Sequence, residues 1–223
     1  MRETKQNVKK RQKGFTLLEL LIVITIIAIM SVALVFVLNP IEILKKSRDT
    51  QRMADLSTLK TAIGVYMTAS TTPQLDNTSG NTLCIGGSAA DTIWGSYIGT
   101  LSGTPMAGTV WVSKTTSAAA SAIDGTGWIP VNLGSLVGGS PISSMPLDPV
   151  NTVTTPSSVT KSDLIYRYAC KASPLSFEID ATLESLAYGP GGSDDRSAKD
   201  GGNHASLFEM GTDLTILTNV DTY

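Results

Sequence analysis

The chain begins with a long apolar segment, and this segment limits what the rest of the protein can be. Residues 15–38 read FTLLELLIVITIIAIMSVALVFVL, and Glu19 is the only charged residue among them. A helix of this length would extend roughly 36 Å, which is enough to cross a hydrocarbon core of about 30 Å. A chain of 223 residues has too small a core to bury such a helix. We therefore expect residues 15–39 to span a membrane.

The charges around this segment predict its orientation. Residues 1–14 hold six of the 17 basic residues and one acid, so this leader carries +5 and the rest of the chain carries −7. Basic flanks stay on the cytoplasmic side. The prediction is a single pass through the inner, cytoplasmic membrane, with the C-terminal head outside the cytoplasm. No nucleic-acid partner is expected, because phosphate binding needs clustered Lys and Arg.

Glu19 separates the interpretations of the apolar segment. A secretory signal peptide has an apolar stretch of about 7–15 residues and then a small-residue cleavage site, which this segment lacks. A plain membrane anchor fits the length but does not explain the carboxylate. An acid within the bilayer costs at least about 2.5 kcal/mol unless it finds a partner. Glu19 is therefore a candidate functional residue.

Residues 13–20, KGFTLLEL, resemble the cleavage and methylation motif of type IV pilins and type II secretion pseudopilins. In that family a prepilin peptidase cuts after the glycine and methylates the new N-terminal residue. The resemblance implies that the leader, residues 1–14, is removed after Gly14 and that Phe15 becomes N-methylphenylalanine. It also implies that Glu19 meets the Phe15 amine of a neighbouring subunit, since a buried cation and a buried carboxylate are tolerable as a pair. The alternative for Glu19 is snorkelling to the membrane interface.

The same resemblance implies a structural role and no enzymatic one. The chain would be a filament subunit of a type IV pilus or of a type II secretion pseudopilus. Its partners would be identical or related pilin subunits, the prepilin peptidase, an inner-membrane assembly platform and, before assembly, membrane lipid. A binding protein, either an adhesin or a DNA-uptake subunit, is the other function class. Trp94, Trp111 and Trp128 would offer it stacking surfaces unless they lie in the core.

Residues 40–72 are expected to continue the helix as an amphipathic segment. Asn39-Pro40 predicts a kink, and Thr71-Thr72-Pro73 ends the helix. Between them an apolar stripe recurs at helical spacing: Met53, Leu56, Leu59, Ile63 and Tyr66 or Met67. The other side carries charges that form either a solvated face or a contact with anionic lipid or an acidic neighbour: Lys45, Lys46, Arg48, Asp49, Arg52 and Asp55.

Residues 73–223 are expected to form an exported, β-rich head with long loops. Ser and Thr account for 40 residues between 71 and 223, which favours strands and loops over helices. Residues 163–171 and 175–183 predict a hairpin, and residues 109–113, 128–133 and 207–217 are weaker strand candidates. The fold class is therefore α+β and pilin-like, with the long N-terminal helix packed on a small antiparallel sheet.

Two cysteines lie in the predicted head. Cys84 and Cys170 would occupy an oxidising compartment after export, where a disulfide is favoured over two free thiols. The disulfide would join the region after the helix to the sheet. A host without oxidising machinery would favour free thiols.

An acidic, glycine-rich loop at residues 189–203 is a candidate calcium site. Asp194, Asp195 and Asp200 lie there among five glycines, and Asp213 is a further candidate ligand. This loop and the Asp148-Pro149 turn resemble features of G-type major pseudopilins, and that resemblance implies bound Ca²⁺. The spacing departs from the family's pattern, and Arg196 and Lys199 lie among the acids. A solvated loop without metal therefore stays open.

Overall fold

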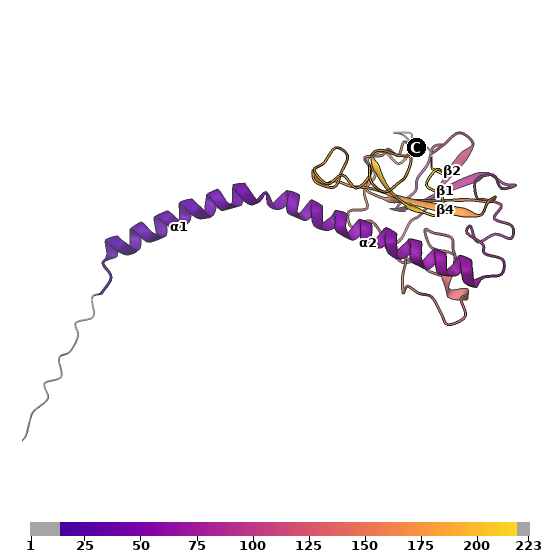
Figure 1. The fold of residues 1–223 in the computed structure, drawn as a ribbon, viewed down its shortest axis with the longest axis horizontal. Helices are drawn as coiled ribbons and strands as arrows, with labels where there is room; N and C mark the ends of the chain where they lie inside the picture. Colours follow the sequence, from indigo (N-terminus) through magenta and orange to yellow (C-terminus); the bar gives the residue numbers. More distant parts are fainter. Residues whose placement is uncertain (1–13, 218–223) are drawn as a thin grey trace, which may run out of the picture. The chain divides into compact units, whose positions relative to one another are not determined.

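The structure is a computed structural model that describes residues 14–217, and the chain divides into two compact units between Ile43 and Leu44. The first unit contains α1 (Leu17–Leu38) and the start of α2 (Pro40–Ala69). The second unit contains the rest of α2 and the head (Figure 1). The elements of the head are β1 (Asp91–Ile98), β2 (Thr109–Lys114), α3 (Ser117–Ala120), the 3-10 helix η1 (Leu133–Ser135), β3 (Tyr166–Lys171), β4 (Ser176–Thr182) and β5 (Leu207–Gly211).

Local chemistry sets the ends of the two long helices. Thr16 caps α1, because its Oγ1 accepts a hydrogen bond from the Glu19 N–H at 3.2 Å. Asn39 ends α1 in the left-handed region, with a φ of 40°. Pro40 then opens α2 at the position where a missing N–H is harmless. The predicted interruption at Asn39-Pro40 is thus a boundary between two helices.

The head is built on a five-stranded sheet with the strand order β2-β1-β3-β4-β5. The predicted hairpin is confirmed, because β3 and β4 pair antiparallel with Tyr168 opposite Ile179. β5 extends this part antiparallel to β4, with Phe208 opposite Ala181. The fold class, α+β and pilin-like, is confirmed.

One face of this sheet packs against α2 (Figure 1). The predicted apolar stripe supplies the helix side of that core, where Leu56, Leu59 and Ile63 are fully buried. Aromatic side chains supply the sheet side, including Tyr168 and Phe177. Loops cover the opposite face and enclose a second, smaller apolar cluster around Ile93, Trp111, Ala169 and Leu207.

The sheet departs from the predicted one in its pairing. β1 and β2 pair in parallel, with Ile93 opposite Trp111, so the sheet is mixed and not wholly antiparallel. Residues 99–108 carry the chain back before it enters β2. The sequence did not predict β1, since Gly95 and Ser96 interrupt its apolar pattern.

The strand predicted at residues 128–133 is wrong. Trp128, Ile129 and Val131 are buried, but they lie in a loop whose bridge is the isolated Asp124–Asn132 pair. Pro130 has no N–H to give to a ladder, and Asn132 caps η1 through its side chain. The apolar pattern there reflects burial without strand pairing.

Candidate functional site

The predicted processing motif lies at the start of α1. Gly14 and Phe15 precede the helix, and Phe15 is 84% exposed. Glu19 lies in the first turn of α1, also exposed. Residues 1–13 of the predicted leader fall outside the described residues. A peptide bond at Gly14–Phe15 is therefore accessible, and the carboxylate lies one turn beyond it.

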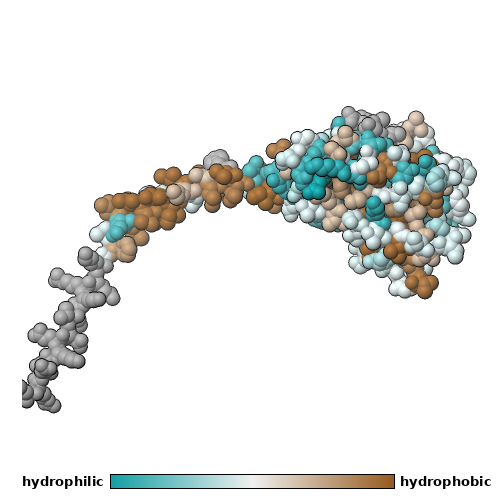
Figure 2. Space-filling model, viewed as in Figure 1, coloured by the Kyte–Doolittle hydropathy of each residue, from teal (hydrophilic) through white to brown (hydrophobic). Residues whose placement is uncertain are grey.

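Apolar side chains surround α1 on all sides. The stretch Leu17–Val35 is long and apolar enough to cross a membrane, and none of it is buried by the residues that the structure describes. Figure 2 shows hydrophobic residues along the visible face of this helix. Residues 14–44 contain no Lys, Arg or His, so Glu19 has no cation to pair with on its own helix. Any cationic partner of this carboxylate would lie outside residues 14–44.

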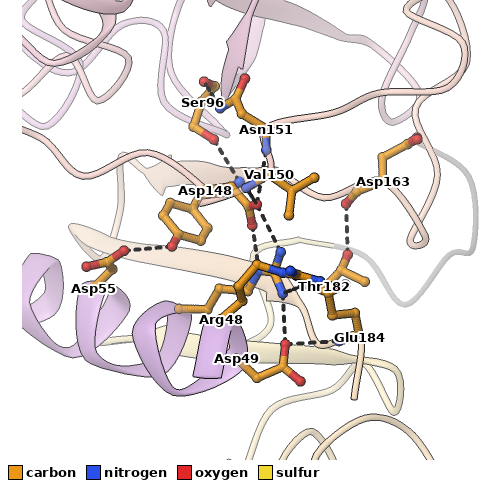
Figure 3. Close-up of polar contacts among 12 residues, drawn as sticks. Arg48, Asp49, Asp55, Ser96, Asp148, Val150, Asn151, Asp163, Thr182 and Glu184 are labelled. Carbon is orange, nitrogen blue, oxygen red and sulfur yellow. Dashed lines mark hydrogen bonds and ion pairs between the residues drawn. The ribbon is translucent and has the colours of Figure 1, made fainter. Parts of the chain in front are cut away.

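The head contains a second group of charged residues, centred on Arg52 of α2. Figure 3 labels its other members, Arg48, Asp49, Asp148 and Glu184. Arg52 has no exposed surface. Its Nε and Nη2 donate to the two carboxylate oxygens of Asp148, at 2.7 and 3.0 Å. Its Nη1 donates to Asp49 and to Glu184, both at 2.8 Å. One guanidinium thus joins α2 to the loop at residue 148 and to the segment after β4.

Arg48 and Asp49 complete this arrangement, which we call the Arg52 cluster (Arg48, Asp49, Arg52, Asp148 and Glu184). Arg48 donates from Nε and Nη2 to both Glu184 oxygens, at 2.6 and 2.8 Å. The hydrogen bond from Arg48 lowers the pKa of Glu184 to about 2. Burial opposes the charge of Arg52, but its hydrogen bond to Asp148 and its other partners outweigh this and raise its pKa. Arg52 and Glu184 therefore stay charged near neutral pH.

Neighbouring polar contacts connect the cluster to two central strands (Figure 3). Asp148 also accepts from the Asn151 N–H, and the Asn151 side chain donates to the Ser96 carbonyl of β1 at 2.8 Å. The hydroxyl of Tyr166, on β3, donates to Asp55 of α2 at 2.8 Å. Burial of Asp55 raises its pKa although the Tyr166 hydroxyl lowers it. Side-chain contacts thus supplement the apolar packing of α2 on the sheet.

The Arg52 cluster corrects the expectation for the charged side of α2. Asp49 and Arg52 are fully buried, so they form neither a solvated face nor a lipid contact. The spacing of Asp49 and Arg52 in the sequence indicates that they are buried. Residues 49, 52, 56, 59 and 63 follow one another at steps of three and four, so the two charged residues continue the buried stripe. A charged pair on that stripe predicts buried partners elsewhere, and the Asp148-Pro149 turn supplies one of them.

The two cysteines form a disulfide in the structure. Both are fully buried, and their Cα atoms lie 4.8 Å apart. The Ile85 N–H donates to the Cys170 carbonyl at 2.7 Å, so the backbones are also joined there. The disulfide holds the region after α2 against β3.

The acids of residues 189–203 are engaged in local contacts. Asp194 pairs with Arg196 and Lys199 at 2.6 and 3.0 Å. Asp195 accepts from the Gly191 N–H, and Asp200 accepts from the Gly202 and Glu209 N–H groups. Within residues 14–217, no group of three or more His, Cys, Asp or Glu side chains is arranged to hold a metal ion. Calcium binding, with or without Asp213, stays a prediction.

The three tryptophans are core residues. Trp94, Trp111 and Trp128 are 3%, 7% and 0% exposed. They therefore offer no stacking surface to a ligand, and the structure gives no support to the binding-protein alternative at these positions.

Comparison with known proteins identifies the N-terminal segment. Residues 9–35 match the family model of the prokaryotic N-terminal methylation motif. No curated protein and no solved structure matches the chain. The matched range includes Gly14, Phe15 and Glu19 and most of α1. The chain thus carries the N-terminal methylation motif that is typical of type IV pilin-like proteins.

Proposed function

We propose that the protein is a structural subunit of a filament, either a type IV pilus or a type II secretion pseudopilus. The prepilin peptidase cleaves after Gly14 and methylates Phe15. An inner-membrane assembly platform then draws the subunit from the lipid into the filament, where it packs against identical or related subunits. The head lies outside the cytoplasm throughout, and the subunit performs no chemistry of its own.

One observation supports this proposal most strongly: the methylation motif is joined to an apolar helix that no other part of residues 14–217 buries. The apolar side chains of Leu17–Val35 are covered by nothing else in the described structure. They need a membrane before assembly and other apolar helices after it. Glu19 needs a cation that its own helix does not contain. The amine created at Phe15 of a neighbouring subunit meets this need.

The test is the intact mass and N-terminal sequence of the protein in material sheared from host cells. We expect a chain that begins at Phe15 and is heavier by one methyl group. This result would report processing and extracytoplasmic assembly together. A full-length chain found in the membrane fraction alone would contradict the proposal and favour a membrane-anchored binding protein.

A further inference from the structure

The head exposes apolar and basic side chains together at the end where α2 enters it. Leu44 is 59% exposed, and Leu186, in the segment after β4, is 76% exposed. Lys46 is exposed and Lys45 is half-buried. We call these residues the basal patch (Leu44, Lys45, Lys46 and Leu186). All four belong to the second compact unit, which begins at Leu44.

Helical periodicity places the α2 part of this patch next to the part that comes from the loop. Lys45 is four residues before Asp49, so it continues the buried stripe of α2 by one turn. Leu44 and Lys46 flank it on the two sides of the helix. Asp49 accepts from the Ser185 N–H at 2.8 Å, which brings the next residue of the loop to this same end of the head. The stripe thus extends beyond the core as an exposed surface.

Backbone contacts fix the exposed position of Leu186. The Asp194 N–H donates to the carbonyl of Ala187 at 2.9 Å, which folds the loop back on itself. Gly192 packs so closely on this turn that a Cβ there would lie 2.5 Å from the Leu186 carbonyl oxygen. The backbone of Leu186 is therefore held on the loop side, and its side chain projects away from the core.

The basal patch also lies close to the end of the membrane helix. α1 has 22 residues and rises about 33 Å, so it fills a hydrocarbon core of about 30 Å and ends at the headgroup layer. Leu44 follows Leu38 by six residues, and the chain is helical from Pro40 onward. The separation is therefore at most about 13 Å, whatever the angle between the two helices. When α1 spans a bilayer, the patch is within or next to the headgroups.

We propose that the basal patch binds anionic lipid headgroups while α1 spans the membrane. Leu44 and Leu186 enter the boundary between headgroups and acyl chains, and the ammonium groups of Lys45 and Lys46 bind lipid phosphates. This inference rests on the proposed function in one respect, which is that α1 spans a membrane before assembly. It adds a second lipid contact, made by the head, which has to break when the subunit leaves the membrane.

The acids at this end of the head do not oppose the contact, because they have cations of their own. Glu184 accepts from Arg48 at 2.6 Å and from Arg52 at 2.8 Å. Asp194 pairs with two cations of its own loop. Neither lysine of the basal patch forms an ion pair with a described residue, so both ammonium groups are available to an anionic surface.

The test places the full-length protein in lipid nanodiscs of phosphatidylcholine and phosphatidylglycerol, with a gadolinium chelate on some of the headgroups. The chelate broadens the methyl NMR signals of residues that contact the headgroup layer. Val137 is the matched control, because it is a fully exposed apolar residue beside Tyr66. Tyr66 lies about 25 Å along α2 from Asp49. We expect the Leu186 signal to broaden several-fold more than the Val137 signal.

A charge variant tests which lipid is bound. In Lys45→Gln combined with Lys46→Gln, the broadening of Leu186 should fall by more than about twofold, because each lysine near an anionic surface adds attraction. The same fall is expected for the wild type in phosphatidylcholine alone. Lys60→Gln, at an exposed lysine in the middle of α2, is the control and should leave the broadening unchanged.

Three results would overturn the proposal. Equal broadening of Leu186 and Val137 would show that the basal patch does not contact lipid. Unchanged broadening of Leu186 in the double variant, or in phosphatidylcholine alone, would show that anionic lipid is not the partner. Shielding of Leu186 in sheared filaments but not in nanodiscs would assign the patch to a second copy of the chain. Protein that fails to enter the nanodiscs would instead contradict the proposed function, since α1 would then not span a membrane.

Discussion

α1 and α2 both contain a carboxylate in an apolar setting, and they handle it in opposite ways. In α2, Asp49 lies on the buried stripe and pairs with Arg52 one turn away, and it also accepts from the Ser185 N–H. In α1, Glu19 lies among apolar residues with no cation between residues 14 and 44. The chain thus satisfies the buried charges of α2 internally, whereas residues 14–44 contain no cation that could pair with Glu19. The contrast shows that α2 contributes buried ion pairs to the head, and under the proposed function α1 is the helix that serves assembly.

The largest expected effect on filament assembly comes from removing the carboxylate of Glu19 in α1. Glu19→Ala should leave the protein processed and in the membrane but abolish sheared filaments, because the Phe15 amine of the neighbouring subunit loses its partner. The measurement is immunoblotting of the sheared and membrane fractions. Glu42→Ala, beyond the apolar helix, is the control and should assemble. A normal filament yield from Glu19→Ala would show that assembly does not need a partner for the Glu19 carboxylate.

Removing the buried guanidinium of Arg52 in α2 should lower the stability of the head instead. Arg52→Ala leaves Asp49, Asp148 and Glu184 close together without their shared cation, and breaking a buried ion pair in this way costs about 3–5 kcal/mol. Denaturant unfolding followed by tryptophan fluorescence measures this loss. Arg52→Lys keeps the charge but cannot reach three carboxylates in the same fork geometry, so an intermediate loss is expected. A loss well under about 1 kcal/mol for Arg52→Ala would show that the apolar stripe alone holds α2.

Acid should weaken the same cluster through Glu184. Its folded pKa of about 2 lies below its ordinary value of 4.5, so it contributes stability above pH 4.5 and loses it as the pH falls toward 2. Glu184→Gln should be less stable than the wild type at pH 6, and the difference should shrink between pH 4.5 and pH 2. Parallel stability curves for the two proteins over that range would contradict this assignment.

The smallest expected effect on stability comes from the hydrogen bond between Asp55 of α2 and Tyr166 of β3. Tyr166→Phe removes the hydroxyl that donates to Asp55 and should cost about 1 kcal/mol. The same unfolding assay measures it. Tyr97→Phe, at a partly exposed tyrosine, is the matched control and should change little. Equal losses for the two variants would mean that the Asp55 contact adds nothing to the apolar packing of α2.

Sequence reasoning predicted the parts of the fold that follow from local pattern. The apolar helix, the stripe at Leu56, Leu59 and Ile63, and the β3–β4 hairpin all have a periodicity or a short connection that is visible in the chain. The parallel pairing of β1 with β2 depends on how residues 99–108 turn back, which no local pattern specifies.

The candidate sites were likewise predictable only where their residues lie close together in the sequence. Gly14, Phe15 and Glu19 form a contiguous motif and were predicted from it. Arg52 and Glu184 are 132 residues apart in the chain. Charged residues on a helix are usually solvated, so only the tertiary fold shows that these two meet. The position of Asp49 and Arg52 on the apolar stripe was the single local sign that they are buried.

The disulfide between Cys84 and Cys170 has a consequence for how the head withstands proteases. The 86-residue separation encloses β1, β2 and the long loops between β2 and β3. A single cut in any of those loops would leave both fragments covalently joined next to β3, with their paired strands still in place. Such a nicked subunit would keep its apparent mass until it is reduced. The disulfide thus protects a head with long loops against the effect of a first cleavage.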